Sequence, residues 1–230
     1  MARVLITGAN KGIGLELTRI YAGNGDTVIA CCRKPSEATA LKELAADKDI
    51  EIHEVQIGED KSVAALATKL AGRPIDLLIN NAGMQGPAPE KQSALHMDFD
   101  GWAEVLNINT LAPVRVMHAL FDHLKLADAP KVVSITSQMG ALDLDMRFAY
   151  AYCTSKAALN KFMKMAALDL AKEKIEVCVI HPGWVKTDMG GAGADITAVE
   201  SAEGIVNVIN GMNAENSGSF WKWNGEVHAW

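Results

Sequence analysis

Residues 3–14 of this 230-residue chain read Arg3-Val4-Leu5-Ile6-Thr7-Gly8-Ala9-Asn10-Lys11-Gly12-Ile13-Gly14. A short apolar run is followed at once by three glycines, and a helical pattern begins at the second of them. Glycine permits a tight turn and removes the side chain that would keep a pyrophosphate from the backbone, while a helix N-terminus supplies unpaired N–H groups. The stretch therefore predicts a strand, a turn and a helix that hold a dinucleotide. The alternative is a glycine-rich turn that binds nothing.

The rest of the chain alternates between short β-type runs and helical patterns, which is typical of βαβ units and a parallel sheet. Strands are expected at Val4–Thr7, Thr27–Cys32, Ile50–Val55, Ile75–Asn80, Lys131–Ser137, Glu176–Ile180 and Ser219–Trp223. Helices are expected at Gly12–Gly23, Ser36–Ala46, Lys61–Ala71, Phe99–Leu126, Tyr152–Lys174 and Val199–Gly211. We therefore expect a single α/β domain over residues 1–230, a Rossmann fold whose doubly wound parallel sheet has about seven strands and helices on both faces.

Composition and charge narrow the function classes. The net charge of −6 argues against nucleic acid and anionic membrane surfaces as partners. The N-terminal apolar run is too short for a signal peptide, and no stretch approaches the roughly 18 apolar residues that span a bilayer. The four cysteines and six histidines show neither a Cys-x-x-Cys pair nor metal-ligand spacing, so no disulfide framework and no metal site are expected. We expect a cytoplasmic protein that acts on a small molecule.

The end of the second expected strand indicates which dinucleotide is preferred. NAD-binding folds usually place an acid there to hold the ribose 2′-hydroxyl, but this chain continues with Arg33 and Lys34. Arg33, together with Lys11 in the glycine turn, would attract a 2′-phosphate. NADP(H) is therefore the expected cofactor, preferred over NAD(H). The alternative is that Arg33 and Lys34 form only a solvated basic end.

A second set of polar residues predicts proton-transfer chemistry. Tyr152 and Lys156 are four residues apart in a helical pattern, so both lie on one face. A neighbouring ammonium should lower the pKa of the tyrosine, which could then exchange a proton with a carbonyl or alcohol oxygen. Ser137 ends the fifth expected strand, where ligands bind in this fold class, and could orient the substrate oxygen. Ser134 and Thr136 remain alternatives to Ser137.

Asn109 is polar within an otherwise apolar helical stretch. Asparagines in the middle of a helix are usually exposed, as Asn107 would be, but Asn109 could hold a water near Lys156 and extend a proton path. Tyr150 has no lysine four residues later, so we interpret it as a packing or pocket residue.

These residues together resemble the short-chain dehydrogenase/reductase family, and within it the C-factor/Sniffer carbonyl-reductase-like subgroup. The resemblance covers nearly the whole chain and rests on Thr7-Gly8-x-x-x-Gly12-x-Gly14, Asn80-Asn81-Ala82-Gly83, Asn109, Ser137, Tyr152-x-x-x-Lys156, Pro182-Gly183 and Thr187. The subgroup is indicated by residues 181–188, by residues 219–225 and by the terminal Trp230. The resemblance implies an NADP(H)-dependent oxidoreductase that reduces a ketone, aldehyde or quinone to an alcohol by hydride transfer.

The resemblance also implies roles for individual residues. Tyr152 would be the general acid/base, with Lys156 lowering its pKa and holding the nicotinamide ribose. Ser137 would polarise the carbonyl, and Asn109 would support a proton-relay water. Contacts with the cofactor are expected from Gly8, Asn10, Lys11, Gly12, Ile13, Gly14, Arg33, Gln56, Ile57, Asn81, Ala82, Gly83, Tyr152, Lys156, Pro182, Gly183, Val185 and Thr187. Gln56 departs from the family pattern, which has an acid there, so adenine binding is expected to be weaker or differently arranged.

Loops and helices suggest how substrate and subunits are bound. The glycine-rich residues 190–194 predict a mobile substrate loop around 186–198, or else a plain flexible connection. Apolar loop residues could line an adaptable pocket or simply pack: Met84, Met139, Met146, Trp184 and Met189. The short stretch from Ser137 to Tyr152 leaves two long helices free to pair, so a homodimer or homotetramer is expected. The alternative function is a non-catalytic dinucleotide-sensing or signalling protein.

Overall fold

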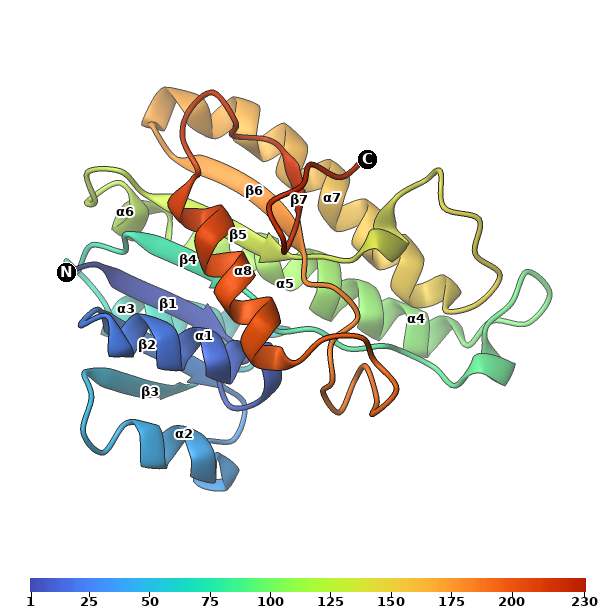
Figure 1. The fold of residues 1–230 in the computed structure, drawn as a ribbon, viewed down its shortest axis with the longest axis horizontal. Coiled ribbons are helices and arrows are strands. Elements are labelled where there is room, and N and C mark those ends of the chain that lie inside the picture. The colour runs from blue at the N-terminus through green and yellow to red at the C-terminus, as the bar shows by residue number, and fades with distance from the viewer.

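A single seven-stranded sheet forms the centre of the molecule (Figure 1). The computed structural model describes all of residues 1–230, and its strands run in the order β3-β2-β1-β4-β5-β6-β7 with every neighbouring pair parallel. The strands are β1 Arg3–Thr7, β2 Thr27–Cys32, β3 Ile50–Glu54, β4 Leu77–Asn80, β5 Lys131–Ile135, β6 Glu176–His181 and β7 Phe220–Lys222. The chain order reverses between β1 and β4, and ligands bind at the carboxyl ends of the strands at such a switch point. The predicted doubly wound parallel sheet is confirmed.

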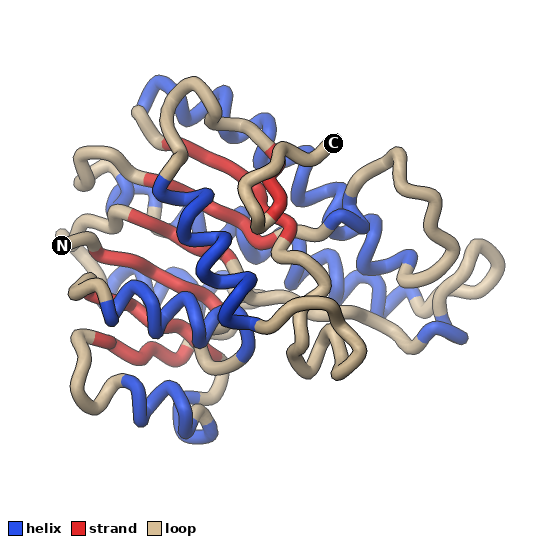
Figure 2. The backbone as a smooth tube through the Cα atoms, in the orientation of Figure 1, coloured by secondary structure: helices blue, strands red, loops and turns tan.

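Helices cover both faces of this sheet (Figure 2). They are α1 Gly12–Gly23, α2 Thr39–Leu44, α3 Asp60–Lys69, α4 Phe99–Leu106, α5 Ala112–Ala119, α6 Phe121–Leu124, α7 Tyr150–Leu170 and α8 Ala198–Asn210. α1 and α8 pack side by side on the face that is in front in Figure 1. α3, α5 and α7 pack on the opposite face.

Successive strand residues enter two separate cores, which explains why the strand sequences are apolar throughout. In β1, Val4 and Ile6 belong to the core beneath α1 and α8, whereas Leu5 between them belongs to the core beneath α5 and α7. All three side chains are fully buried. Side chains alternate between the faces of a strand, so a sheet that is covered on both faces needs apolar residues at every position.

The prediction of a single helix over Phe99–Leu126 is wrong. α4 ends at Leu106, a π-helical turn follows over Asn107–Leu111, and α5 and α6 continue as separate short helices. Pro113 carries no N–H for an ordinary helical hydrogen bond, and the N–H of Ala112 bonds instead to the carbonyl of Asn107, five residues earlier. The wider turn places Asn109 in the interior.

Other boundaries differ by a few residues. The expected helix Ser36–Ala46 is a 3-10 turn, Pro35–Glu37, followed by the short α2. α7 begins two residues earlier than predicted, at Tyr150, and β5 ends at Ile135, so Ser137 lies just beyond the strand. None of the helices combines the length and the apolar character needed to cross a bilayer.

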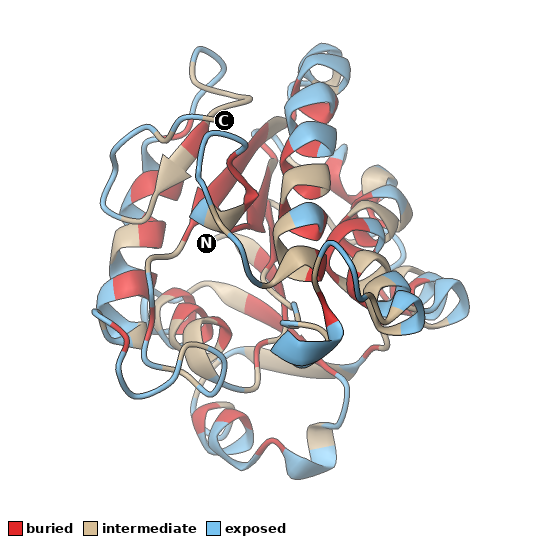
Figure 3. Cartoon of the chain, turned by 90° about the vertical axis from the view of Figure 1, so that its right-hand side faces the viewer, coloured by how far each residue is buried: buried red, intermediate tan, exposed pale blue.

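Three long loops project from the edge where the strands end, on the right in Figure 1. They follow β4, β5 and β6. Viewed from this end, the strands behind the loops are buried, whereas the loops themselves are largely exposed (Figure 3). A ligand at the carboxyl ends of the strands would therefore be surrounded by these loops.

Candidate active site

The glycine turn is shaped by backbone geometry that only glycine adopts without strain. Gly8 and Gly12 have φ angles of +68° and +54°. A Cβ on Gly14 would lie 2.2 Å from the carbonyl oxygen of Gly8, so the first turn of α1 packs directly against the start of the glycine turn. Asn10 and Ile13 are half-buried within the same turn.

The turn is fastened to the loop after β4. The Asn81 side-chain amide donates to the carbonyl oxygens of Thr7 at 3.0 Å and Gly8 at 3.2 Å. The Thr7 hydroxyl accepts from the N–H groups of Asn81 at 3.1 Å and Ala82 at 3.2 Å. The amide of Asn81 therefore positions the glycine turn.

The N-terminus of α1 suits an anion. No side chain caps it, and no acidic residue lies in its first turn. Unpaired N–H groups and the helix dipole are then free to bind phosphate. Arg33 lies exposed just beyond β2, next to the strand that leads into the turn. The turn, the free helix end and Arg33 together fit the dinucleotide that the sequence predicts.

The structure brings Ser137, Tyr152 and Lys156 together. Lys156 is 4 % exposed, and its Nζ donates to the carbonyl of Ile135 at 2.8 Å while lying 5.7 Å from the centre of the Tyr152 ring. The Tyr152 hydroxyl interacts with the Ser137 side chain. The segment just beyond β5 and the first two turns of α7 thus present one compact group of a hydroxyl, a phenol and an amine.

Burial controls the proton affinities in this group. It raises the pKa of Tyr152 to about 12, against a smaller lowering by the hydrogen bond with Ser137. Burial also lowers the pKa of Lys156 to about 8. The expected fall in the pKa of Tyr152 is wrong for this arrangement, because burial of the phenol disfavours its charged form and outweighs the lowering by Ser137.

Ser137 is the hydroxyl that remains available among the three candidates after β5. Thr136 donates from Oγ1 to Asn160 Oδ1 at 2.6 Å, and Ser134 Oγ accepts from Asn80 Nδ2 at 3.4 Å. Both of those side chains are almost completely buried and already have a side-chain partner. Ser137 instead accepts at Oγ from the N–H of Met139 at 3.1 Å and lies beside Tyr152.

Asn109 is buried in the π-helical turn, where its side chain bonds to the loop after β4. Its Oδ1 accepts from the N–H of Met84 at 2.8 Å, and its Nδ2 donates to the Met84 carbonyl at 2.8 Å and to Ser155 Oγ at 3.1 Å. A Cβ on Gly83 would lie 3.2 Å from Asn109 Oδ1 and 3.7 Å from Lys156 Nζ, so the loop passes close to both. Asn109 therefore fixes the loop beside Lys156.

Asn107 and the segment after β3 pack against each other. The Asn107 side-chain amide donates to the carbonyl of Gly58 at 3.2 Å, so this asparagine is not the exposed residue that was expected. Arg115 donates to the carbonyl of Ile57 at 3.0 Å and forms an ion pair with Asp60. The backbone just after Gln56 is thus held by the π-helical turn and by α5.

The segment after β6 reaches back to the glycine turn. Pro182, Gly183 and Val185 begin it, and a Cβ on Gly12 would lie 3.1 Å from Thr187 Cγ2. Lys11 Nζ and Asp188 Oδ2 form an ion pair at 2.7 Å, and Gln85 Nε2 donates to the Met189 carbonyl at 2.5 Å. Sequence reasoning missed Asp188 and Gln85, because no local pattern indicates a contact between residues 177 positions apart, as Lys11 and Asp188 are.

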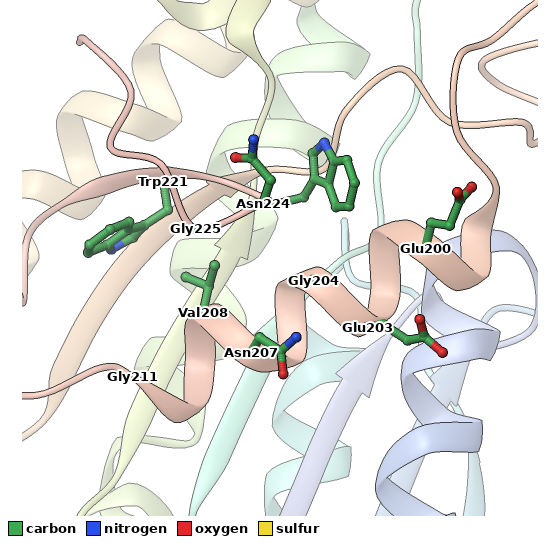
Figure 4. Close-up of a pocket in the computed structure, with 10 residues that line it drawn as sticks. Glu200, Glu203, Gly204, Asn207, Val208, Gly211, Trp221, Asn224 and Gly225 are labelled. Atoms are coloured by element: carbon green, nitrogen blue, oxygen red, sulfur yellow. The ribbon is translucent and has the colours of Figure 1, made fainter.

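Two cavities lie outside this group. One of about 210 Å³ contains Met139 and Met146 with Tyr150 and Cys153, but not Met84, Trp184 or Met189. A larger groove of about 530 Å³ runs between α8 and the end of the chain, beside Trp221 and Glu203 (Figure 4). Neither cavity includes a predicted catalytic residue. Of the five residues expected to form an apolar pocket, only Met139 and Met146 line the same cavity.

Comparisons with known proteins agree with this geometry. The model of the family described as short chain dehydrogenase matches residues 2–196. C-signal of Myxococcus xanthus is 40% identical over 168 residues, which cover 72% of this chain and 99% of that protein. The NADPH-bound carbonyl reductase from chicken fatty liver has a TM-score of 0.92 at 32% identity, with 100% of this chain and 99% of that chain covered. The carbonyl reductase Sniffer of D. melanogaster has a TM-score of 0.92 at 28% identity, with 100% of both chains covered.

Proposed function

The chain belongs to the short-chain dehydrogenase family, and from that membership we propose that it is an NADP(H)-dependent reductase that converts a carbonyl compound to an alcohol. The observation that carries the proposal is the grouping of Ser137, Tyr152 and Lys156 at the carboxyl edge of the sheet. The glycine turn opens onto the same edge. A carbonyl compound held between them would meet a proton donor and a reductant together.

The residues for the cofactor follow from the shape and charge of the crevice. The glycine turn and the uncapped start of α1 would bind the pyrophosphate, and Lys11 and Arg33 would bind the 2′-phosphate. The loop after β4, the edge at Gln56 and Ile57, and the segment from Pro182 to Thr187 would line the remaining length of the cofactor. The chicken carbonyl reductase with this fold is bound to NADPH, which supports NADP(H) here.

The chemistry of the chain's own side chains suits reduction. When bound, NADPH supplies the hydride. Tyr152 is protonated at neutral pH, and burial raises its pKa further, so its O–H is available to donate a proton to the carbonyl oxygen. Ser137 would orient that oxygen with a second hydrogen bond. Lys156 has a pKa of about 8, close enough to neutrality to exchange a proton readily.

A homodimer or homotetramer is part of the proposal. α7 exposes an apolar stripe, with Leu168 at 78 % and Met165 at 54 %, and Leu111, in the π-helical turn that packs against α7, is 53 % exposed. Such side chains on a helix that also carries the reacting groups favour pairing of subunits through this face. Sedimentation or light scattering would show a particle of two or four chains, and a monomer at micromolar concentration would contradict this part.

The function is tested by cofactor titration and a substrate panel. We expect NADPH to bind more tightly than NADH by fluorescence titration, and NADPH to be consumed in the presence of some members of a panel of ketones, aldehydes and quinones. Tighter binding of NADH would contradict the cofactor assignment. NADPH binding without consumption across the panel would favour the sensing or signalling alternative, for which the similarity to C-signal is the supporting observation.

A further inference from the structure

The loop after β6, residues 184–196, is attached to two other segments across the carboxyl edge of the sheet. The Lys11–Asp188 ion pair joins it to the glycine turn, and the hydrogen bond from Gln85 to Met189 joins it to the loop after β4. Thr187 also packs against Gly12 at the start of α1. The loop therefore lies over the end of the turn that would bind the pyrophosphate.

Two negatively charged groups can bind the Lys11 ammonium: the Asp188 carboxylate and the proposed 2′-phosphate of the cofactor. It stands at the carboxyl end of β1, whose neighbours are β2 on one side and β4 on the other. Arg33 and the proposed 2′-phosphate site lie at the end of β2, while Asp188 follows β6 on the opposite side. The Lys11 ammonium contacts Asp188 at 2.7 Å, so the carboxylate holds the cation that the proposed 2′-phosphate site would use.

The ion pair is weak enough to be exchanged. The side chains of Lys11 and Asp188 are 68% and 79% exposed, so water competes with their attraction. The Lys11 ammonium lowers the pKa of the Asp188 carboxyl by a hydrogen bond and by its charge. A phosphate monoester carries more charge than one carboxylate and accepts more hydrogen bonds, so it is the stronger partner for the same ammonium.

We propose that Asp188 competes with the 2′-phosphate of NADP(H) for Lys11. The ion pair then acts as a latch: it holds residues 184–196 against the glycine turn, and the 2′-phosphate releases the loop by taking over the lysine. A cofactor without that phosphate leaves the latch closed. Asp188 thus contributes to the choice between NADP(H) and NAD(H), and the inference rests on the proposed function.

The matched pair of variants is Asp188→Asn and Asp195→Asn. Both remove one negative charge from exposed positions in the same loop, but only Asp188 contacts Lys11. We expect D188N to lower the Kd for NADPH about two- to fivefold, the range for an exposed ion pair, and to leave the Kd for NADH unchanged. D195N should change neither constant beyond a small effect common to both cofactors.

A second readout needs no turnover. Lys186 is exposed within the loop and offers a trypsin site. We expect 2′,5′-ADP, which carries the 2′-phosphate, to speed cleavage of the wild type at Lys186, and 5′-ADP at matched occupancy not to do so. D188N should be cleaved faster without any ligand and should gain nothing from 2′,5′-ADP.

The outcomes separate the two proposals. If the wild type binds NADPH but D188N matches D195N in both assays, the latch is wrong and the proposed function stands. If the wild type binds neither NADPH nor 2′,5′-ADP, both the cofactor assignment and the latch are wrong.

Discussion

Two lysines at the same edge of the sheet sit in opposite environments. Lys156 is 4 % exposed and donates to a backbone carbonyl, whereas the Lys11 side chain is 68% exposed and donates to a carboxylate on a loop. A buried ammonium is fixed by packing and shifts its pKa, while an exposed one keeps its charge hydrated and can change partners. The difference favours the buried lysine for the proposed proton chemistry and the exposed one for the proposed recognition of phosphate.

The largest effect that this contrast predicts comes from Tyr152, in the buried group. Tyr152→Phe keeps the ring but removes the proton donor, so kcat should fall about 10²- to 10⁴-fold, the range for loss of a general acid. The Kd for NADPH should stay within about twofold, since the exposed groups proposed to bind the phosphates are untouched. Steady-state kinetics and fluorescence titration measure the two quantities.

Tyr150→Phe is the matched control for that change. Tyr150 is half-buried on the same helix, two residues earlier, and lines the smaller cavity. Its hydroxyl is not part of the proposed proton transfer, so kcat should change far less. Equal losses in the two variants would show that α7 tolerates no change there and would remove Tyr152 from its assigned role.

The next effect is on stability and depends on pH. The pKa of Lys156 is about 8 in the folded protein, below the roughly 10.4 of an unfolded lysine. Between these values the unfolded chain binds more protons, so the cost of burying the ammonium is present below pH 8 and disappears as pH rises toward 10.4. Relative to Lys156→Met, the wild type should gain at most about 3 kcal/mol of unfolding free energy between pH 7 and pH 10.

Lys161→Met is the control for this titration. Lys161 is exposed on the same helix, so its ammonium is hydrated in both the folded and the unfolded chain. The free energy of unfolding of Lys161→Met, measured with urea, should differ from that of the wild type by the same amount at pH 7 and at pH 10. A pH-independent difference for Lys156→Met as well would contradict the burial effect at Lys156.

The smallest of the three predicted effects is on cofactor affinity and comes from Arg33, which is exposed. Arg33→Ala should raise the Kd for NADPH about tenfold, because it removes a charge-assisted contact with the 2′-phosphate, and should leave the Kd for NADH unchanged. Lys34→Ala is the comparison, since Lys34 pairs with Glu37 at 2.9 Å. Isothermal titration with both cofactors measures these constants. An equal loss of affinity for NADH would show that Arg33 does not bind the 2′-phosphate.

The fold and the family were predictable because the deciding residues are close together in the sequence. Continuous apolar runs predicted the parallel strands, and the sheet confirms them. The similarity to C-signal and to Sniffer confirms the predicted subgroup. The prediction of one helix over Phe99–Leu126 was wrong, because the apolar periodicity does not reveal that hydrogen bonds shift from the carbonyl four residues earlier to the one five residues earlier ahead of Pro113.

The sequence by itself determined the order of the elements and the face that Tyr152 shares with Lys156, because strand alternation and the helical repeat are local properties. Only the tertiary structure decided how strongly each of these groups holds its proton, since desolvation depends on everything packed around them. It alone also decided that Lys11 meets Asp188, 177 residues away, through a loop that follows a strand three positions along the sheet.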